Sequence, residues 1–375
     1  MITAAAVALG VGGSIFALDR ATLPVLPVPQ TPAAPILDGR SDDRAWEEAP
    51  SLTVETESGA NLQDGASTVD IQAVATGEEI VFKFRWEDPT RSFKHLPLRK
   101  TEAGWRLMHN QYDIEDEDGY YEDKFAVLLT RSPEIGGGGT VHMGPNPHEG
   151  LPESLGGRGL HYTADGSIAD LWHWKAVRSE PSGFMDDNYI GAPAKPKEEE
   201  IAGTVRYKAG YATDPGKAPY SNNFAHEGPG GYREPLTPKR LPVNLSELQE
   251  RIGPVDLDPN VSDAAPLYLS EALSVPYSAE ADAAIPVGTI IPGVLIADAP
   301  WEGDRADLRS AARWEEGYWT LEVSRKLVTG SKFDLPFDGA EPLYLWVSVF
   351  DHSQTRHTRH MRPIELRIEA AQPTG

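Results

Sequence analysis

Short segments in which apolar and polar residues alternate dominate the chain from about residue 34 onward, separated by clusters of Gly, Pro and Asp. This alternation is typical of antiparallel strands with one buried face. The clearest strands are predicted at residues 69–74, 80–86, 124–129, 318–323 and 344–350. With 375 residues the chain can bury a substantial core. We therefore predict a mainly β protein, an antiparallel β-sandwich with long loops and a few short helices.

Two short helices are expected among the strands. Residues 244–252 are predicted to be helical because Asn244 can cap the start, Glu247 falls in the first turn and Gly253 follows the end. Residues 266–273 are predicted to form the second helix. The helices are therefore minor elements of the expected fold.

The expected domain organisation is simple. Residues 186–242 are crowded with Pro, Gly, Lys, Asn and Tyr and show little periodicity, which predicts a long excursion from the sheets. Excursions of this length are commonly binding loops or partner contacts. Strands are expected on both sides of it, so residues 36–370 are predicted to form one discontinuous domain.

The N-terminal segment predicts export. Residues 1–18 are apolar, and a helix of this length would measure about 26 Å, which is marginal for a bilayer core. No Lys or Arg precedes the apolar run and no clear small-x-small site follows it, which favours an uncleaved membrane anchor or a misassigned start over a simple cleaved signal. Residues 19–35 are rich in Pro and are predicted to be a semi-rigid spacer. We expect a periplasmic or other extracytoplasmic location.

Charge and cysteine content exclude several classes of function. The formal net charge is −23, so the surface would repel nucleic acid and anionic lipid headgroups. There are 0 cysteines, which excludes disulfides, thiolate zinc sites, iron–sulfur clusters and haem attached through cysteines. Any haem would therefore be bound non-covalently, as haem b.

Other catalytic and metal motifs lack support. No Ser lies in a Gly-x-Ser-x-Gly elbow, and the glycines at 136–139 are not followed by Lys-Ser or Lys-Thr. The acidic segment at residues 113–119 has the wrong spacing for an EF-hand and is predicted to be a solvated turn. Other calcium geometries stay open.

Two segments carry candidate iron ligands. His142 and Met143 follow a run of four glycines, which would let a flat ligand approach the backbone. A buried Met beside an exposed His is also ordinary packing. The loop at residues 351–361 carries three histidines and basic residues that could pair with haem propionates. A basic surface loop, or a zinc or copper site at His357 and His360, are the alternatives.

A third segment alternates aromatic and polar residues. Trp172 and Trp174 would share one face of a strand, and His173 and Lys175 the other. The tryptophans are expected in the core rather than against a cofactor.

Several segments in this order resemble one known family, the ethylbenzene dehydrogenase-related haem-binding domains. The resemblance spans about residues 34–369. The family includes the haem b γ subunits of ethylbenzene and dimethylsulfide dehydrogenase-type molybdoenzymes, together with cytochrome relatives. The similar segments are residues 36–39 with Trp46, 82–88, 122–127, 142–144, 170–176 and 186–187.

The resemblance implies a sandwich like those of DOMON domains and family-nine carbohydrate-binding modules, holding one haem between loops. In the γ subunits a Met of the Met-Gly segment and a Lys of the C-terminal loop hold the iron. Met143 matches the first ligand. The loop at residues 351–361 has no Lys, so His360 and then His357 are expected as the second ligand. His142 could replace Met143.

Two further histidines are candidate ligands, and the ligand set predicts the type of function. His161 and His173 are reserve ligands. A six-coordinate iron has no open position for substrate, so the chain is expected to be an electron-transfer subunit rather than an enzyme. Its partner would be a redox protein, either a molybdoenzyme or a membrane cytochrome. The alternatives are a haem-free carbohydrate- or ligand-binding sandwich, marked by aromatic residues in a cleft, and a structural subunit of a membrane complex.

Overall fold

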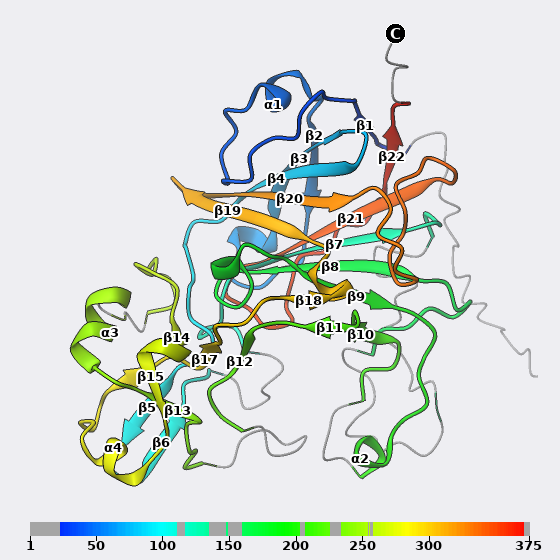
Figure 1. Cartoon of the computed structure of the whole chain (residues 1–375). Coiled ribbons are helices and arrows are strands. Elements are labelled where there is room, and N and C mark those ends of the chain that lie inside the picture. The colour runs from blue at the N-terminus through cyan, green and yellow to red at the C-terminus, as the bar shows by residue number, and fades with distance from the viewer. Residues whose placement is uncertain are drawn as a thin grey trace, which may run out of the picture.

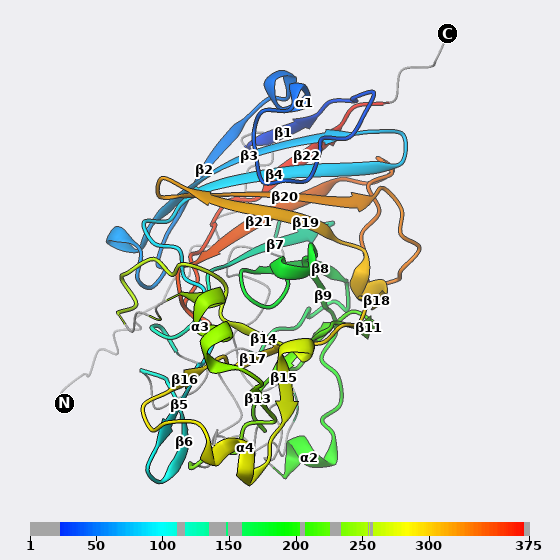
Figure 2. The same cartoon turned by 60° about the vertical axis from the view of Figure 1, so that its left-hand side comes forward.

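Two β-sheets packed face to face form the main body of the protein, and a smaller lobe lies beside them (Figures 1 and 2). The computed structural model describes residues 23–110, 117–134, 148, 160–202, 207–225, 234–253, 255 and 258–370. The predicted antiparallel β-sandwich is confirmed.

The larger sheet has seven strands and draws on both ends of the chain. Its strands, in spatial order, are β1 (Val25–Val28), β22 (Ile364–Ile368), β21 (Leu343–Phe350), β7 (Lys124–Thr130), β8 (Ala169–Lys175), β9 (Asp186–Ile190) and β10 (Tyr211–Thr213). The β1–β22 pair is parallel and the other pairs are antiparallel. The two chain ends therefore share one edge of this sheet.

The second sheet has five antiparallel strands. In spatial order they are β19 (Arg309–Glu315), β20 (Tyr318–Lys326), β4 (Glu79–Glu87), β3 (Ser67–Ala75) and β2 (Leu52–Thr56). All five strands predicted from the alternation lie in one or other of these two sheets.

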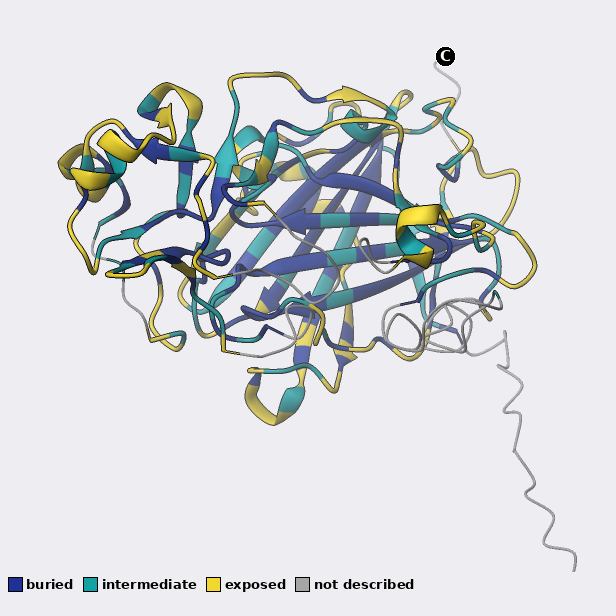
Figure 3. Cartoon of the chain, turned by 90° about the horizontal axis from the view of Figure 1, so that it is seen from below, coloured by how far each residue is buried: buried dark blue, intermediate teal, exposed yellow. Residues whose placement is uncertain are grey.

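The core lies between the sheets, where alternate residues of each strand face inward. Trp86 of β4 and Trp319 of β20 meet Phe125 of β7 and Trp174 of β8 there. Burial of such large aromatic surfaces is the main contribution to the stability of a sandwich. Figure 3 shows the buried strands crossing the middle of the molecule.

The smaller lobe is built from insertions between sandwich strands. Its sheets and helices are β5 (Leu98–Thr101), β6 (Gly104–Leu107) and β16 (Ile290–Ile291); β12 (Tyr220–Asn222), β14 (Tyr268–Ser270) and β17 (Val294–Ile296); β13 (Arg240–Pro242) and β15 (Ser274–Pro276); α3 (Leu245–Ile252) and α4 (Ala279–Ala283). Trp105, Phe224 and Leu241 lie in its own apolar core. The predicted excursion is therefore a folded lobe as well as a set of loops.

The remaining regular elements are short. They are β11 (Gly216–Lys217) and β18 (Glu302–Gly303), the helices α1 (Arg44–Glu48) and α2 (Glu198–Ile201), and the 3-10 turns η2 (Gln63–Gly65), η5 (Glu180–Ser182), η6 (Glu271–Leu273) and η7 (Asp304–Ala306).

One predicted helix is confirmed and the other is wrong. In α3 the Asn244 side chain accepts hydrogen bonds from the backbone N–H groups of Ser246 and Glu247, as the cap predicted. Residues 266–273 instead form strand β14 and the turn η6. Leu269 is fully buried there, and pairing of β14 with β17 outweighs the local helical preference.

Two predicted boundaries also change. Part of the expected spacer at residues 19–35 is strand β1, because Leu26 and Val28 are buried against the sandwich core. The expected excursion at residues 186–242 begins with β9 and includes β10, both of which are strands of the large sheet. Residues 1–18 lie outside the described residues. In the part of the chain that the structure describes, no helix is long and apolar enough to cross a membrane.

Candidate functional site

Strand β8 has two chemically different faces, as its sequence predicted. Trp172 and Trp174 are fully buried in the core between the sheets. His173 and Lys175 point to the opposite, outer face of the seven-stranded sheet, since successive side chains of a strand alternate. The outer face is the one that carries the candidate site.

Histidines and an aromatic ring meet on this outer face. His173 packs against Phe350 of β21, with ring centroids 5.3 Å apart, and His357 packs against the same phenyl ring at 4.7 Å. The Lys124 Nζ lies 3.9 Å from the Phe350 ring centroid. The His173 Nε2 is buried and has no hydrogen-bond partner among the described residues.

The His357 ring has a defined protonation. Its Nδ1 lies 2.7 Å from the carbonyl oxygen of Thr358. A carbonyl can only accept, so Nδ1 carries the proton and Nε2 keeps its lone pair. Burial lowers the pKa of His357 despite this hydrogen bond, so the ring is neutral. This is the arrangement typical of a metal-binding histidine, whose second nitrogen donates to a carbonyl or carboxylate.

His360 has the opposite protonation. The backbone N–H of Val347 donates to its Nδ1 at 3.4 Å, so Nδ1 holds the lone pair. Burial lowers the pKa of His360 to about 4, and the proton of the neutral ring is then on Nε2. Thr358 exchanges hydrogen bonds with Val349 of β21. His360 contacts the same strand two residues earlier, at Val347.

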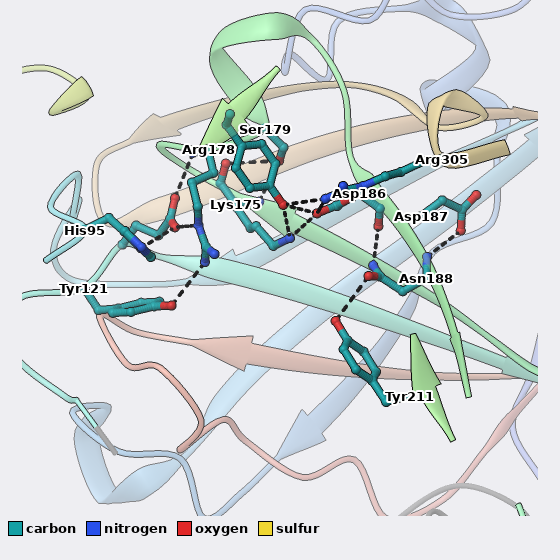
Figure 4. Close-up of polar contacts among 12 residues, drawn as sticks. His95, Tyr121, Lys175, Arg178, Ser179, Asp186, Asp187, Asn188, Tyr211 and Arg305 are labelled. Atoms are coloured by element: carbon teal, nitrogen blue, oxygen red, sulfur yellow. Dashed lines mark hydrogen bonds and ion pairs between the residues drawn. The ribbon is translucent and has the colours of Figure 1, made fainter. Parts of the chain in front are cut away.

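A buried ion cluster adjoins the histidines. Lys175 and Arg305 both contact the carboxylate of Asp186, Arg305 through Nε–Oδ1 at 2.6 Å and Nη2–Oδ2 at 2.9 Å. The Tyr220 hydroxyl donates to Asp186 and lies 2.9 Å from Lys175 Nζ. Figure 4 shows Lys175 of β8, Asp186 of β9 and Arg305 of η7 converging. Burial alone would raise the pKa of Asp186, but Lys175 and Arg305 hold it far below its usual range.

A second carboxylate extends this cluster. Glu122 contacts Arg178 and accepts hydrogen bonds from the backbone N–H groups of Val177 and Arg178, at 2.6 and 3.0 Å. The His95 Nδ1 lies 3.0 Å from Glu122. Burial opposes ionisation of Glu122, but Arg178 and His95 outweigh it and keep its pKa well below normal. Glu122 is therefore a carboxylate at neutral pH.

Positive charge exceeds negative charge on this outer face. Three basic side chains (Lys175, Arg178 and Arg305) contact the two carboxylates of Asp186 and Glu122, and the Lys124 Nζ donates to the Gln354 carbonyl at 2.7 Å. Burial and the neighbouring Arg178 lower the pKa of Lys124 well below its usual value. A buried excess of cations is favourable only with an anionic partner. The outer face is thus suited to a flat aromatic ligand with carboxylate groups.

Not every predicted ligand can be placed. His142 and Met143 lie outside the described residues. His161 forms an isolated bridge to Ala209, beside the start of β10 at the edge of the large sheet, two strands from the strand of His173. Most of the acidic segment 113–119 is also outside the described residues, but Glu117 is fully buried and its carboxylate accepts backbone hydrogen bonds from Asn110, Gly119 and Tyr120.

Sequence reasoning missed the ion cluster. Lys124 and Lys175 lie at the ends of predicted strands, where an exposed position is the usual expectation for Lys. The available indication was that both fall within segments of the family resemblance, next to buried aromatic residues. Arg305 and Tyr220 are distant in sequence and could not be assigned to the site without the fold.

The family model for ethylbenzene dehydrogenase matches residues 43–362. The chain belongs to this family. No curated protein matches the chain.

Solved structures with a similar arrangement are distant. A family-nine carbohydrate-binding module from Caldicellulosiruptor kristjanssonii in complex with cellotriose is 7% identical, with a TM-score of 0.32 over 93% of this chain and 96% of that one. A putative carbohydrate-binding protein from Bacteroides uniformis is 9% identical, with a TM-score of 0.32 over 93% and 100%. A likeness at this level says nothing about what this chain binds.

Proposed function

We propose that this member of the ethylbenzene dehydrogenase family is a haem b-binding electron-transfer subunit that performs no substrate chemistry itself. The observation that carries the proposal is the pairing of His357, in the protonation state of a metal ligand, with an outer face rich in buried cations. Haem b offers an iron, a flat aromatic ring and two carboxylates, so it matches each part of this face.

The described residues fit haem by three independent tests. The His173 Nε2 is a buried nitrogen without a partner among the described residues. The Phe350 ring packs against both His173 and His357 and supplies an aromatic surface there. The basic side chains of Lys175, Arg178 and Arg305, which outnumber the carboxylates they contact, would hold the propionates by charge-assisted hydrogen bonds. When bound, the haem iron supplies one-electron chemistry.

For the ligands we propose His357 in preference to His360, with Met143 on the other side of the iron. His360 would have to give up its hydrogen bond from Val347 and move its ring proton before Nε2 could bind metal. His142 is the alternative to Met143, and His173 is the reserve for either side. The ligand pair remains a prediction.

The proposed setting is an exported redox complex. The apolar segment 1–18 would anchor the chain outside the cytoplasm, and a molybdoenzyme or a membrane cytochrome would exchange electrons with it. The net charge of −23 favours a partner with a basic docking surface over nucleic acid.

The experiment is a reduced-minus-oxidised visible spectrum with a pyridine haemochrome assay, on chain expressed under haem-replete export conditions. One haem b per chain is expected, with a low-spin spectrum. His357→Ala should lose that spectrum or the haem, and Met143→Ala should do the same. His360→Ala is the matched control and should keep a low-spin haem, at a small cost in stability.

Other outcomes would change the conclusion. A folded, colourless protein would reject the haem proposal and favour a ligand-binding or structural sandwich. A His357→Ala variant with an unchanged low-spin spectrum, together with loss in His360→Ala, would reverse the ligand assignment. An unchanged spectrum in Met143→Ala would indicate that His142, and not Met143, is the iron ligand.

A further inference from the structure

Four aspartates gather on the inner side of the sandwich, at the edge of the large sheet. Asp170 lies on β8, Asp187 on β9, Asp214 just after β10 and Asp334 in the loop after β20. Their exposed fractions are 0%, 0%, 2% and 7%. Asp187 is the cross-strand neighbour of Trp172, and Asp170 is two residues from it, so both face the core side.

The carboxylate oxygens are close together. One oxygen each of Asp170, Asp187 and Asp334 lie within 4.8 Å of one another. The Asp214 backbone N–H donates to the Asp187 carbonyl at 3.1 Å, which brings the fourth carboxylate alongside. The cluster therefore joins three strands of one sheet to a loop of the other.

Two of these oxygens have nothing to bind. Among the described residues, no hydrogen bond reaches Oδ1 of Asp170 or Oδ2 of Asp187, while the carboxyl groups of Asp214 and Asp334 share a hydrogen bond with each other. A buried carboxylate oxygen without a partner is costly, and native proteins normally satisfy it with a donor, a water or a metal ion. These oxygens are thus potential ligands.

The neighbouring cation does not balance the cluster. Arg325 of β20 lies with Nη1 2.6 Å from Asp170 Oδ2 and 4.0 Å from Asp334 Oδ2. It contacts two of the four carboxyl groups. Burial raises the pKa of Asp187, and the nearby Asp170 and Asp334 raise it further, as expected for carboxylates held together without enough positive charge.

We propose that this cluster, formed by Asp170, Asp187, Asp214 and Asp334, is a structural calcium site. Calcium takes several carboxylate and carbonyl oxygens at about 2.3–2.6 Å, so ligand atoms across the ion lie up to about 5 Å apart, as these do. Magnesium demands shorter bonds and a stricter octahedron, and zinc prefers nitrogen and sulfur. The bound ion connects β8, β9 and the segment after β10 to the loop that follows β20.

A second acidic group in the core does not share these properties. Asp123, Asp351 and His352 also lie close together. The Asp123 carboxylate, however, accepts hydrogen bonds from the backbone N–H groups of Ser92 and His352 and from the Trp319 indole. Asp123 is therefore a suitable internal control.

The test is calorimetric titration of the EGTA-stripped chain with calcium chloride, with thermal unfolding as a second readout. We expect one calcium ion per chain and a Tm that rises with calcium, because the ion binds the folded state. Asp187→Asn and Asp214→Asn should each weaken binding about tenfold or more, since affinity follows the number of charged ligands. Asp123→Asn and the exposed Asp338→Asn should bind calcium like the unmodified chain.

Several results would overturn the proposal. They are no heat and no Tm shift up to about 10 mM calcium, binding that Asp187→Asn and Asp214→Asn leave unchanged, or binding that is lost in Asp123→Asn. An equal Tm shift with magnesium would overturn the choice of calcium. If Asp187→Asn fails to fold, the Tm of the unmodified chain with calcium and with EGTA still decides the question. Haem content is measured in the same samples, so loss of haem cannot be mistaken for loss of calcium.

Discussion

Asp186 and Asp187 are neighbours on β9, both fully buried, yet their carboxylates are in opposite electrostatic states. Asp186 faces outward to Lys175, Arg305 and Tyr220, and its pKa is depressed. Asp187 faces inward to other carboxylates, and burial together with Asp170 raises its pKa. Burial is common to both, so the charge of the neighbours decides which form is stable.

The same contrast separates the two faces of this sheet edge. On the outer face, basic residues outnumber the carboxylates they contact, and on the inner face Arg325 contacts two carboxylates of a cluster of four aspartates. One strand thus lies between a site suited to an anion and a site suited to a cation. The difference shows how a pair of adjacent acidic residues can serve two ligands of opposite charge.

The largest effect is expected from exchanging the two neighbours for amides. Asp186→Asn leaves Lys175 and Arg305 buried without their counter-charge and should lower the free energy of unfolding by about 3–5 kcal/mol. Asp187→Asn, in EGTA, puts a neutral amide where the charged carboxylate is already disfavoured and should change it by less than about 1 kcal/mol. Urea denaturation of both variants at pH 7 checks this. Equal losses would mean that the two carboxylates are not electrostatically different.

A third carboxylate separates the effect of hydrogen bonds from that of charge. Glu180 accepts hydrogen bonds from the Trp174 indole at 2.6 Å and the Ala312 backbone at 2.8 Å. Burial raises its pKa to about 7 despite these bonds. Two hydrogen bonds therefore do not replace a cation.

This pKa predicts a pH dependence of stability. The folded state binds the Glu180 proton between the ordinary pKa of 4.5 and about 7, whereas the unfolded state releases it, so stability falls as pH rises through this range. Glu180→Gln should lack this loss, which amounts to about 3 kcal/mol. Unfolding is compared at pH 4 and pH 8 in both proteins. A parallel decline in the variant would assign the pH dependence to other groups.

The smallest effect tests the hydroxyl on the outer face. Tyr220→Phe removes a group that contacts Lys175, Arg305 and Asp186, and should cost about 1–2 kcal/mol. Tyr211→Phe is the matched control because its hydroxyl donates to the neutral side chain of Asn188, at 3.2 Å. Its cost should be smaller. The same urea experiment measures the free energy of unfolding of both variants. A larger loss in Tyr211→Phe than in Tyr220→Phe would mean that the Tyr220 hydroxyl does not stabilise the ion cluster.

The sequence predicted those parts of the fold that local patterns determine. Long alternating strands such as β4 and β20 were identified because one face of each is buried over nine residues. The strands of the smaller lobe have two to four residues, which is too short for alternation to be recognised, and β14 was predicted as helix.

The candidate sites were predictable only in part. The outward position of His173 and Lys175 followed from alternation with Trp172 and Trp174. The inner aspartates come from β8, β9, the segment after β10 and the loop after β20, and only the strand register brings them together. The choice between His357 and His360 depends on which backbone group reaches each Nδ1, and composition and spacing carry no information on that.

The position of β21 has a consequence for the order in which the protein can fold. This strand lies between β7 and β22, and β22 carries β1, so the last tenth of the sequence forms the middle of the large sheet and holds its first strand. Contacts between residues so distant in sequence are slow to form. A chain emerging from the ribosome cannot close this sheet until residue 368 is available. The large sheet therefore closes only after almost all of this sequence has been synthesised.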